Sequence, residues 1–243
     1  MQMTSGGGTM AHNVEMTLGE FADELRRGAR AILQVRHAER PKMDPKDPTF
    51  GDSLPITCEG VRTARLLGES LREFAPCTEF WTSPLRRTRM TAAAIAEGMG
   101  LSGVEIPADG RLGNETFYYR DTSEVLAVFT PPENFFPSCI AYMDTGVQRG
   151  FNGLGESSDA LENWLFERFS RRLMIAATHD LYIAAFLAAR GAYPDRSRDT
   201  WPRFLDGAAI IVRPGGERRY ALVRAGLSDG IVGVPPEHAL LPA

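Results

Sequence analysis

The 243-residue chain alternates short, almost continuous apolar runs with segments of helical spacing, and this alternation constrains its fold more than any other feature. Ala31–Val35 and Leu173–Ala177 are apolar at nearly every position rather than at every second one. Continuous runs of this length are typical of strands that are buried on both faces of a sheet. Because helical segments separate the strands, the pattern predicts an α/β fold of three layers, a mainly parallel sheet flanked by helices.

The remaining elements follow the same order along the chain. Thr57 is a suitable N-cap for one helix, and Ser83 followed by Pro84 has the form of an N-cap and a first helical residue for the next. Further strands are predicted over Thr78–Thr82, Val104–Ile106, Ala208–Val212 and Tyr220–Arg224, and helices over Leu18–Arg27, Glu59–Phe74, Pro84–Gly98, Ala160–Arg171 and Asp180–Arg190.

One domain is expected over residues 16–243, preceded by a flexible Gly/Ser/Thr-rich leader over Met1–Glu15. Asn114–Ser157 breaks the alternation and is rich in aromatic residues, so we interpret it as an insertion or cap over the site. Its aromatic side chains either line a pocket for a ring-bearing phosphate ester or form the insertion's own small core. The side chains in question are Phe117, Tyr118, Tyr119, Phe129, Phe135 and Phe136.

Charge and cysteine content exclude several classes of protein. Lys and Arg total 27 against 31 Asp and Glu, a net charge of -4, which argues against binding nucleic acid through bulk positive charge. The three cysteines form no CxxC pair, so neither a zinc ribbon nor a thioredoxin-type redox pair is expected. The sequence has no apolar run of about 20 residues and no signal-peptide pattern, so we expect a cytoplasmic protein without a membrane partner.

Chemically active residues directly follow three of the predicted strands: Arg36-His37, Ser83–Arg87 and His179-Asp180. In sheets of this type, ligands bind at the carboxyl ends of the strands. His37 stands between Arg36 and Arg40, whose charges are expected to lower the pKa of the imidazole and keep it neutral. A neutral imidazole is a nucleophile and guanidinium groups bind phosphate, although a strand-end histidine beside two surface arginines would have the same sequence.

Three arginines, Arg86, Arg87 and Arg89, open the helix that follows the second of these strands. Cations are ordinarily unfavourable at a helix N-terminus, whereas anions bind there, so an anionic ligand would explain the cluster. The alternative is solvated helix surface, which we expect for two of the three. For His179 and Asp180, the alternative to a site is a helix cap followed by an acidic residue in the first turn.

In combination, these motifs resemble those of the histidine phosphatase superfamily, the clan of phosphoglycerate mutases and histidine acid phosphatases. The resemblance extends from Ile32 to about Arg190 in the family's order and leaves Asn114–Ser157 unmatched. Ala38 stands where the family has glycine after its nucleophile. The matching segments are Arg36–Glu39 (Arg-His-Gly-Glu in the family), Leu54–Gly60 (Leu-Thr-x-x-Gly), Thr82–Thr88 (Ser-Pro-x-x-Arg-Thr) and Thr178–Asp180 (the second-histidine motif).

The resemblance implies a covalent route for phosphoryl transfer. His37 would attack phosphorus to form phosphohistidine, and water would then release phosphate. The general acid would be Asp180, by likeness to the acid-phosphatase branch, or Glu115, by likeness to the mutase branch. Phosphate binding would fall to Arg36, Arg40, Arg87 and His179.

No metal and no cofactor is expected, because the arginines would repel a divalent cation from the potential ligands His37, Glu39, His179 and Asp180. The reaction that the resemblance implies is hydrolysis of a small-molecule phosphomonoester. Two alternatives stay open: a phosphomutase or phosphotransferase of the same superfamily, and a catalytically silent protein that binds a phospholigand. The oligomeric state is also left open.

Overall fold

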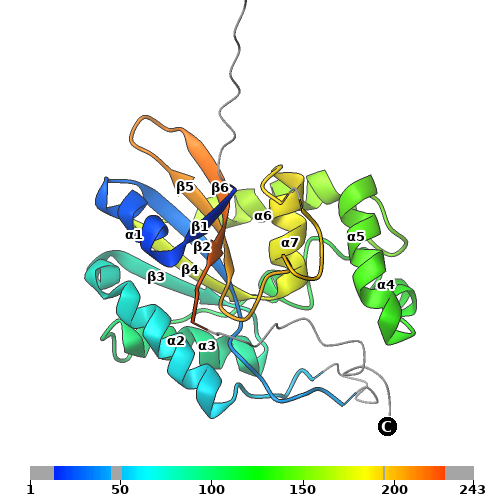
Figure 1. The fold of residues 1–243 in the computed structure, drawn as a ribbon, viewed down its shortest axis with the longest axis horizontal. Helices are drawn as coiled ribbons and strands as arrows, with labels where there is room; N and C mark the ends of the chain where they lie inside the picture. Colours follow the sequence, from blue (N-terminus) through cyan, green and yellow to red (C-terminus); the bar gives the residue numbers. More distant parts are fainter. Residues whose placement is uncertain (1–13, 45–50, 194, 228–243) are drawn as a thin grey trace, which may run out of the picture.

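The computed structural model describes residues 14–44, 51–193 and 195–227. Among these residues, six strands form a single sheet in the order β1-β6-β5-β2-β4-β3 (Figure 1). The strands predicted around residues 31, 78, 173, 208 and 220 are all present. Their bounds are β1 Glu15–Thr17, β2 Arg30–Arg36, β3 Thr78–Thr82, β4 Leu173–Thr178, β5 Gly207–Val212 and β6 Arg218–Arg224.

The sheet is mixed, and its parallel part positions the site. Strand β4 pairs in parallel with both β2 and β3, and β1 pairs in parallel with β6, whereas β5 runs antiparallel to β2 and β6. Register places Arg36 opposite Thr178 and Thr82 opposite Ala177. Because β2, β4 and β3 run in the same direction, the residues that follow them emerge at one edge of the sheet, as the sequence predicted.

Helices cover both faces of the sheet, which confirms the predicted three-layer α/β fold. One core contains residues of α1, α2 and α3, together with Leu33 and Val35 of β2, and the other contains residues of α5, α6 and α7, together with Ile32. Alternate residues of β2 therefore enter different cores, which explains its continuous apolar run. The helices are α1 Leu18–Arg26, α2 Cys58–Ser70, α3 Arg86–Gly98, α4 Thr122–Val128, α5 Phe135–Thr145, α6 Leu154–Arg168 and α7 Asp180–Ala189, with 3-10 helices η1 Arg72–Cys77, η2 Gly110–Leu112 and η3 Pro132–Asn134.

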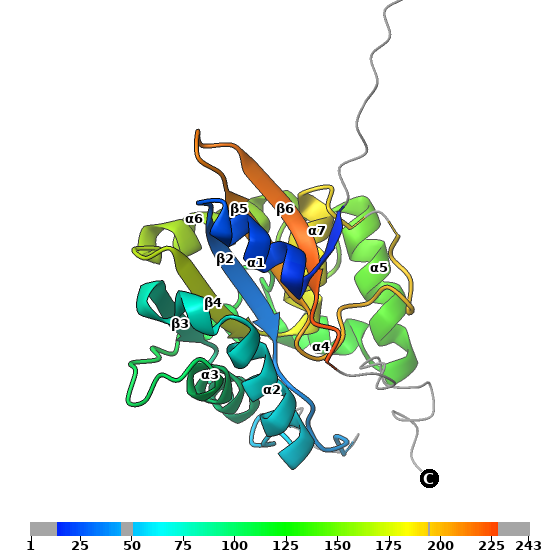
Figure 2. The same ribbon diagram turned by 60° about the vertical axis from the view of Figure 1, so that its left-hand side comes forward.

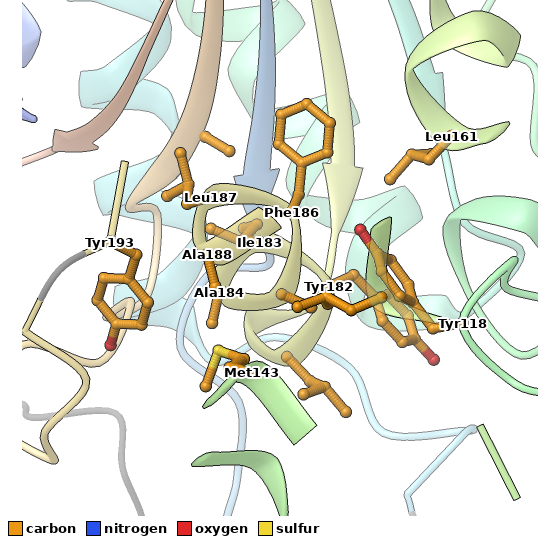
Figure 3. Close-up of a cluster of buried hydrophobic side chains, with 14 of the residues drawn as sticks. Tyr118, Met143, Leu161, Tyr182, Ile183, Ala184, Phe186, Leu187, Ala188 and Tyr193 are labelled. Carbon is orange, nitrogen blue, oxygen red and sulfur yellow. The ribbon is translucent and has the colours of Figure 1, made fainter. Parts of the chain in front are cut away.

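The predicted insertion forms a helical layer around α7. Figures 1 and 2 show α5 beside α7, on the side away from α2 and α3. Helix α7 is buried all round, from Leu181 to Ala188, because the sheet covers one side and the insertion another. Figure 3 shows Tyr118 and Met143 from the insertion lying against this helix. The six aromatic residues singled out from the sequence are all buried in this core or packed against it.

Four sequence predictions need correction. Val104–Ile106 forms no strand, and β3 makes only an isolated bridge with Ala108 nearby. Helix α3 begins at Arg86 with Leu85 as its N-cap, because the Ser83 hydroxyl bonds elsewhere. Helix α6 begins at Leu154, inside the predicted insertion, and α2 ends at Ser70 before a 3-10 helix.

The predicted leader is also too long. Strand β1 starts at Glu15, and the carbonyl of Val14 accepts a hydrogen bond from the Leu222 amide of β6. The rest of the predicted leader, residues 1–13, lies outside the described part of the chain. Within the described residues, no helix is both long enough and apolar enough to span a membrane.

Two glycines allow α2 and α3 to approach closely, and their replacement should destabilise the fold. A β-carbon on Gly68 would overlap the Ile95 carbonyl oxygen, and one on Gly98 would overlap that of Arg65. We expect Gly98→Ala to lower the free energy of unfolding by about 1–3 kcal/mol, as overpacking does. Gly155→Ala on α6 is the matched control, since nothing lies within 4 Å of its new methyl group. Urea unfolding measures both, and equal effects would contradict the close approach.

Candidate active site

Two histidines meet where β2 and β4 end. His37 directly follows β2 and His179 directly follows β4, and their ring centroids are 5.6 Å apart at an interplanar angle of 65°. The backbone amide of His37 donates to the Thr178 carbonyl at 3.0 Å, so the parallel pairing of the two strands continues to the first histidine. The structure thus brings together two residues that are 142 positions apart in the sequence.

The His37 ring has a defined tautomer. Its Nδ1 lies 2.9 Å from the carbonyl oxygen of Ala38, which can only accept a hydrogen bond. The proton is therefore assigned to Nδ1, and Nε2 keeps its lone pair. Burial lowers the pKa of His37 well below its ordinary value, and the positive charges of Arg36 and Arg87 lower it further. These effects favour the neutral ring, whose free lone pair is on Nε2.

Ala38 fits its position without backbone strain. Among the described residues other than glycine, Leu205 has a positive φ and Ala38 does not. The Ala38 amide donates to the Thr91 hydroxyl of α3 at 2.9 Å, and the side chain is fully buried. The change from the glycine of the resembled motif therefore needs no left-handed conformation.

Glu39 has a structural position close to His37 in the chain. Its carboxylate accepts a hydrogen bond from the Thr57 hydroxyl at 2.6 Å, and its carbonyl accepts from the Thr57 amide at 2.8 Å. Thr57 in turn caps α2, as predicted, by accepting from the Gly60 amide. A β-carbon on Gly60 would overlap the Glu39 carbonyl, which accounts for the glycine in the Leu54–Gly60 segment.

Arg36 lies buried beneath this pair of histidines. Its guanidinium forms an ion pair with Asp180 at 3.0 Å and donates to the Pro202 carbonyl at 2.7 Å. The Phe204 ring lies over the same group, with 4.5 Å between the guanidinium carbon and the ring centroid. Burial lowers the pKa of Arg36, whereas the negative charge of Asp180 opposes that shift.

Arg40 and Arg87 complete a cluster of cations. Arg87 is buried and donates to the Gly51 carbonyl at 2.7 Å. Burial and the charge of Arg40 lower the pKa of Arg87 to about 10, and burial and the charge of Arg36 lower that of Arg40. The charges of Arg87, Arg36 and Arg40 all lower the pKa of His179, which indicates that the three guanidinium groups lie around this ring. Arg86 and Arg89 are exposed, so the expectation that one of three arginines belongs to the site agrees with the geometry.

His179 is held by a serine that sequence reasoning assigned to a helix cap. The Ser83 hydroxyl lies 3.2 Å from Nε2 of His179 and 2.6 Å from the Thr88 hydroxyl. Burial and the charge of Arg87 lower the pKa of His179 to about 3. Both histidines are therefore neutral and both are surrounded by arginines, an arrangement that favours an anionic ligand.

The two candidate acids occupy different environments. Asp180 accepts hydrogen bonds from the indole Nε1 of Trp201 at 3.1 Å and from the Leu181 amide at 2.9 Å. Burial alone would raise the pKa of Asp180, but the charge of Arg36 and these two hydrogen bonds outweigh it, so the pKa is lowered. Glu115 is exposed, and no hydrogen bond among the described residues joins its carboxylate to the histidines.

Sequence reasoning missed the segment 201–206, which precedes β5. Trp201 bonds to Asp180, and the Phe204 ring centroid lies 5.6 Å from that of His37. Leu205, at a φ of 68°, donates its amide to the Arg36 carbonyl. Asp206 accepts from the Arg203 amide and pairs with Arg224 at 2.8 Å. The sequence signal that could have indicated this segment is the pair of aromatic residues Trp201 and Phe204, which precede the predicted strand Ala208–Val212.

The lowered histidine pKa values predict that the fold loses stability in mild acid. The folded state keeps His37 and His179 neutral, whereas the unfolded chain binds a proton on each as pH falls through about 6.5. The free energy of unfolding in urea should therefore be smaller at about pH 5 than at about pH 7.5. His179→Gln should reduce this difference, because one of the two groups is gone. A difference that does not change would show that the folded ring is not held neutral.

Comparison with known proteins agrees with these motifs. Residues 32–116 match the histidine phosphatase superfamily (branch 1), and no curated protein sequence matches the chain. The fold resembles that of YhfR from Bacillus stearothermophilus, with 18% identity and a TM-score of 0.54 over 82% of this chain and 99% of that one.

Two further solved structures are similar. The phosphoglycerate mutase from Bacillus anthracis has 14% identity and a TM-score of 0.51, covering 82% of this chain and 93% of that one. A candidate alpha-ribazole-5'-P phosphatase from Escherichia coli has 13% identity and a TM-score of 0.51, covering 82% and 98%. The matched segment carries His37 and Arg87, so this chain is similar to the histidine phosphatase superfamily in sequence over residues 32–116, and it shares the fold of these solved structures.

Proposed function

We propose that the protein is a metal-independent phosphomonoesterase that hydrolyses a small-molecule phosphate ester through a phosphohistidine on His37. The observation that carries the proposal is the neutral imidazole of His37, anchored through Nδ1 and surrounded by three arginines and a second neutral histidine. The similarity of residues 32–116 to the superfamily supports it, and the structures with a similar fold include a candidate phosphatase as well as a mutase.

The first half-reaction is displacement at phosphorus. The lone pair on Nε2 of His37 forms the N–P bond while the ester P–O bond breaks, and the leaving oxygen takes a proton from Asp180. Arg36, Arg40, Arg87 and His179 bind the remaining phosphate oxygens and neutralise their charge. The products of this step are an alcohol and phosphohistidine.

The second half-reaction is hydrolysis. The Asp180 carboxylate removes a proton from water, the oxygen attacks phosphorus, and the N–P electron pair returns to Nε2. A bound phosphate dianion shares the positive charge of Arg36, so it raises the pKa of Asp180 and allows the carboxyl group to carry a proton. Without phosphate, the ion pair with Arg36 keeps Asp180 ionised.

Removal of the nucleophile should abolish turnover. We expect His37→Ala to lower phosphate release from a panel of phosphomonoesters by on the order of 10³-fold or more. Arg87→Ala should lower kcat/KM by roughly 10²-fold or more, because a buried phosphate ligand is lost. Arg89→Ala, on the same helix but exposed, should retain nearly full activity. Equal losses in the two arginine variants would contradict the assignment, and a wild-type protein without turnover would contradict the proposed function.

The leaving group identifies the general acid. An alkyl ester needs a proton on its leaving oxygen, whereas a p-nitrophenyl ester leaves readily without one. Asp180→Asn should therefore reduce hydrolysis of an alkyl phosphate roughly 10²-fold or more, with a much smaller effect on p-nitrophenyl phosphate. Glu115→Gln serves as the comparison and should affect both esters alike. The opposite pattern would transfer the role to Glu115.

A mutase is the second candidate, because one of the similar structures is a phosphoglycerate mutase. The two functions differ in what accepts the phosphoryl group from His37. In a phosphatase, added alcohol captures only a small fraction and inorganic phosphate dominates, whereas a mutase transfers the group to a second hydroxyl. Product analysis by ³¹P NMR in the presence of an added alcohol separates them.

A further inference from the structure

The indole of Trp201 lies between Asp180 and helix α5 of the insertion. The side chain is 1% exposed, and its Nε1 donates to Oδ2 of Asp180 at 3.1 Å. On the insertion side, Phe135 and Phe136 of α5 contact the indole edge-to-face, with ring centroids 6.4 and 5.2 Å away. The same residue therefore touches a proposed catalytic carboxylate and a helix outside the site.

The backbone around Trp201 is fixed from two other directions. Arg224 of β6 donates to the carbonyls of Thr200 and Trp201 at 2.8 and 3.4 Å. The following carbonyl, of Pro202, accepts from the guanidinium of Arg36. Two arginines therefore hold the backbone around Trp201, and α5 packs against its ring. Together these contacts fix the indole where its Nε1 donates to Asp180.

The carboxylate of Asp180 gains its orientation from these contacts. Oδ1 accepts from the Leu181 amide in the first turn of α7, while Oδ2 forms the ion pair with Arg36 and accepts from Trp201. When a bound phosphate pairs with Arg36, the ion pair between Arg36 and Asp180 weakens. The indole of Trp201 then remains as the side-chain hydrogen-bond donor to Oδ2 of Asp180. Trp201 is then the contact that keeps the carboxyl group directed as it exchanges a proton.

We propose that Trp201 is a positioning residue for Asp180, and that the insertion holds the indole in place through α5. The inference deepens the proposed phosphatase function and rests on it for its kinetic consequence. It also gives the aromatic residues of the insertion a role in which Phe135 and Phe136 support the site through packing.

Several charged and titratable groups lie near Asp180, and their charges affect the pKa of its carboxyl group. Arg36 lies closest, on β2, and His179 precedes it in the chain. The other groups that interact with its charge are Arg40, Arg87, Tyr119, Cys139 and Tyr182.

The hydrogen bond can be observed without any enzyme assay. The chain has three tryptophans, so a ¹⁵N-labelled sample gives three indole N–H signals, and Trp201→Phe identifies one of them. Asp180→Asn should shift that signal. Trp164 is the matched control, because its side chain is 5% exposed but its Nε1 has no partner among the described residues. A Trp201 signal that does not respond to Asp180→Asn would overturn the proposal.

The role of α5 is tested by Phe136→Leu, which keeps an apolar side chain but removes the aromatic edge contact. We expect the Trp201 indole signal to shift or broaden, and the signals of Trp81 and Trp164 to stay in place. If the Trp201 signal is unchanged, the insertion does not hold the indole. Thermal unfolding of each variant shows whether it is folded at the assay temperature.

Kinetics separate positioning from a loss of folded protein. Trp201→Phe should lower kcat for an alkyl phosphate roughly tenfold, as loss of one hydrogen bond to a charged group does, with KM nearly constant. The effect on p-nitrophenyl phosphate should be much smaller, and Trp164→Phe should affect neither ester. A uniform loss on both esters would mean a structural role and contradict the proposal. Absence of wild-type turnover would reject the proposed function, while the indole signals would still decide whether Trp201 fixes Asp180.

Discussion

The guanidinium of Arg36, buried at the end of a central strand, is the constraint around which the rest of the site is arranged. A buried cation is strongly destabilising unless it is paired and hydrogen-bonded. Two segments supply three groups that satisfy it: the first residue of α7 supplies the Asp180 carboxylate, and the loop before β5 supplies the Pro202 carbonyl and the Phe204 ring. The site is therefore preorganised, since these segments are fixed before a ligand binds.

The charge around the two histidines is positive, whereas the net charge of the protein is negative. The net charge is -4, yet Arg36, Arg40 and Arg87 gather around two neutral histidines. Burial dominates the histidine pKa values, and the neighbouring cations reinforce it, so neither ring adds a charge to the cluster. The resulting attraction for anions is local, and under the proposed function its ligand is a single phosphate group.

The features of the fold that depend on local sequence patterns could be predicted from the sequence. The apolar runs located β2, β3 and β4, and the parallel arrangement then implied that His37, Arg87 and His179 would converge. The prediction that Ser83 caps α3 was wrong, because its hydroxyl bonds to Thr88 and His179 instead. His179 is 96 positions away in the sequence, so no local pattern indicates this contact. The 201–206 loop was equally hidden, since the bond from Arg36 to Pro202 spans 166 positions and leaves no periodic signal. The insertion was located by its composition, but its support of Trp201 required the packing of α5.

In the proposed mechanism, Nε2 of His37 carries the phosphoryl group, because Nδ1 is occupied by its bond to the Ala38 carbonyl. The most direct measurement is to quench the enzyme in alkali during turnover and examine the phosphoprotein by ³¹P NMR and by peptide mass spectrometry. We expect one alkali-stable, acid-labile phosphoryl group, on His37 and bonded to Nε2. A phosphoryl group on Nδ1, or on any other residue, would contradict it.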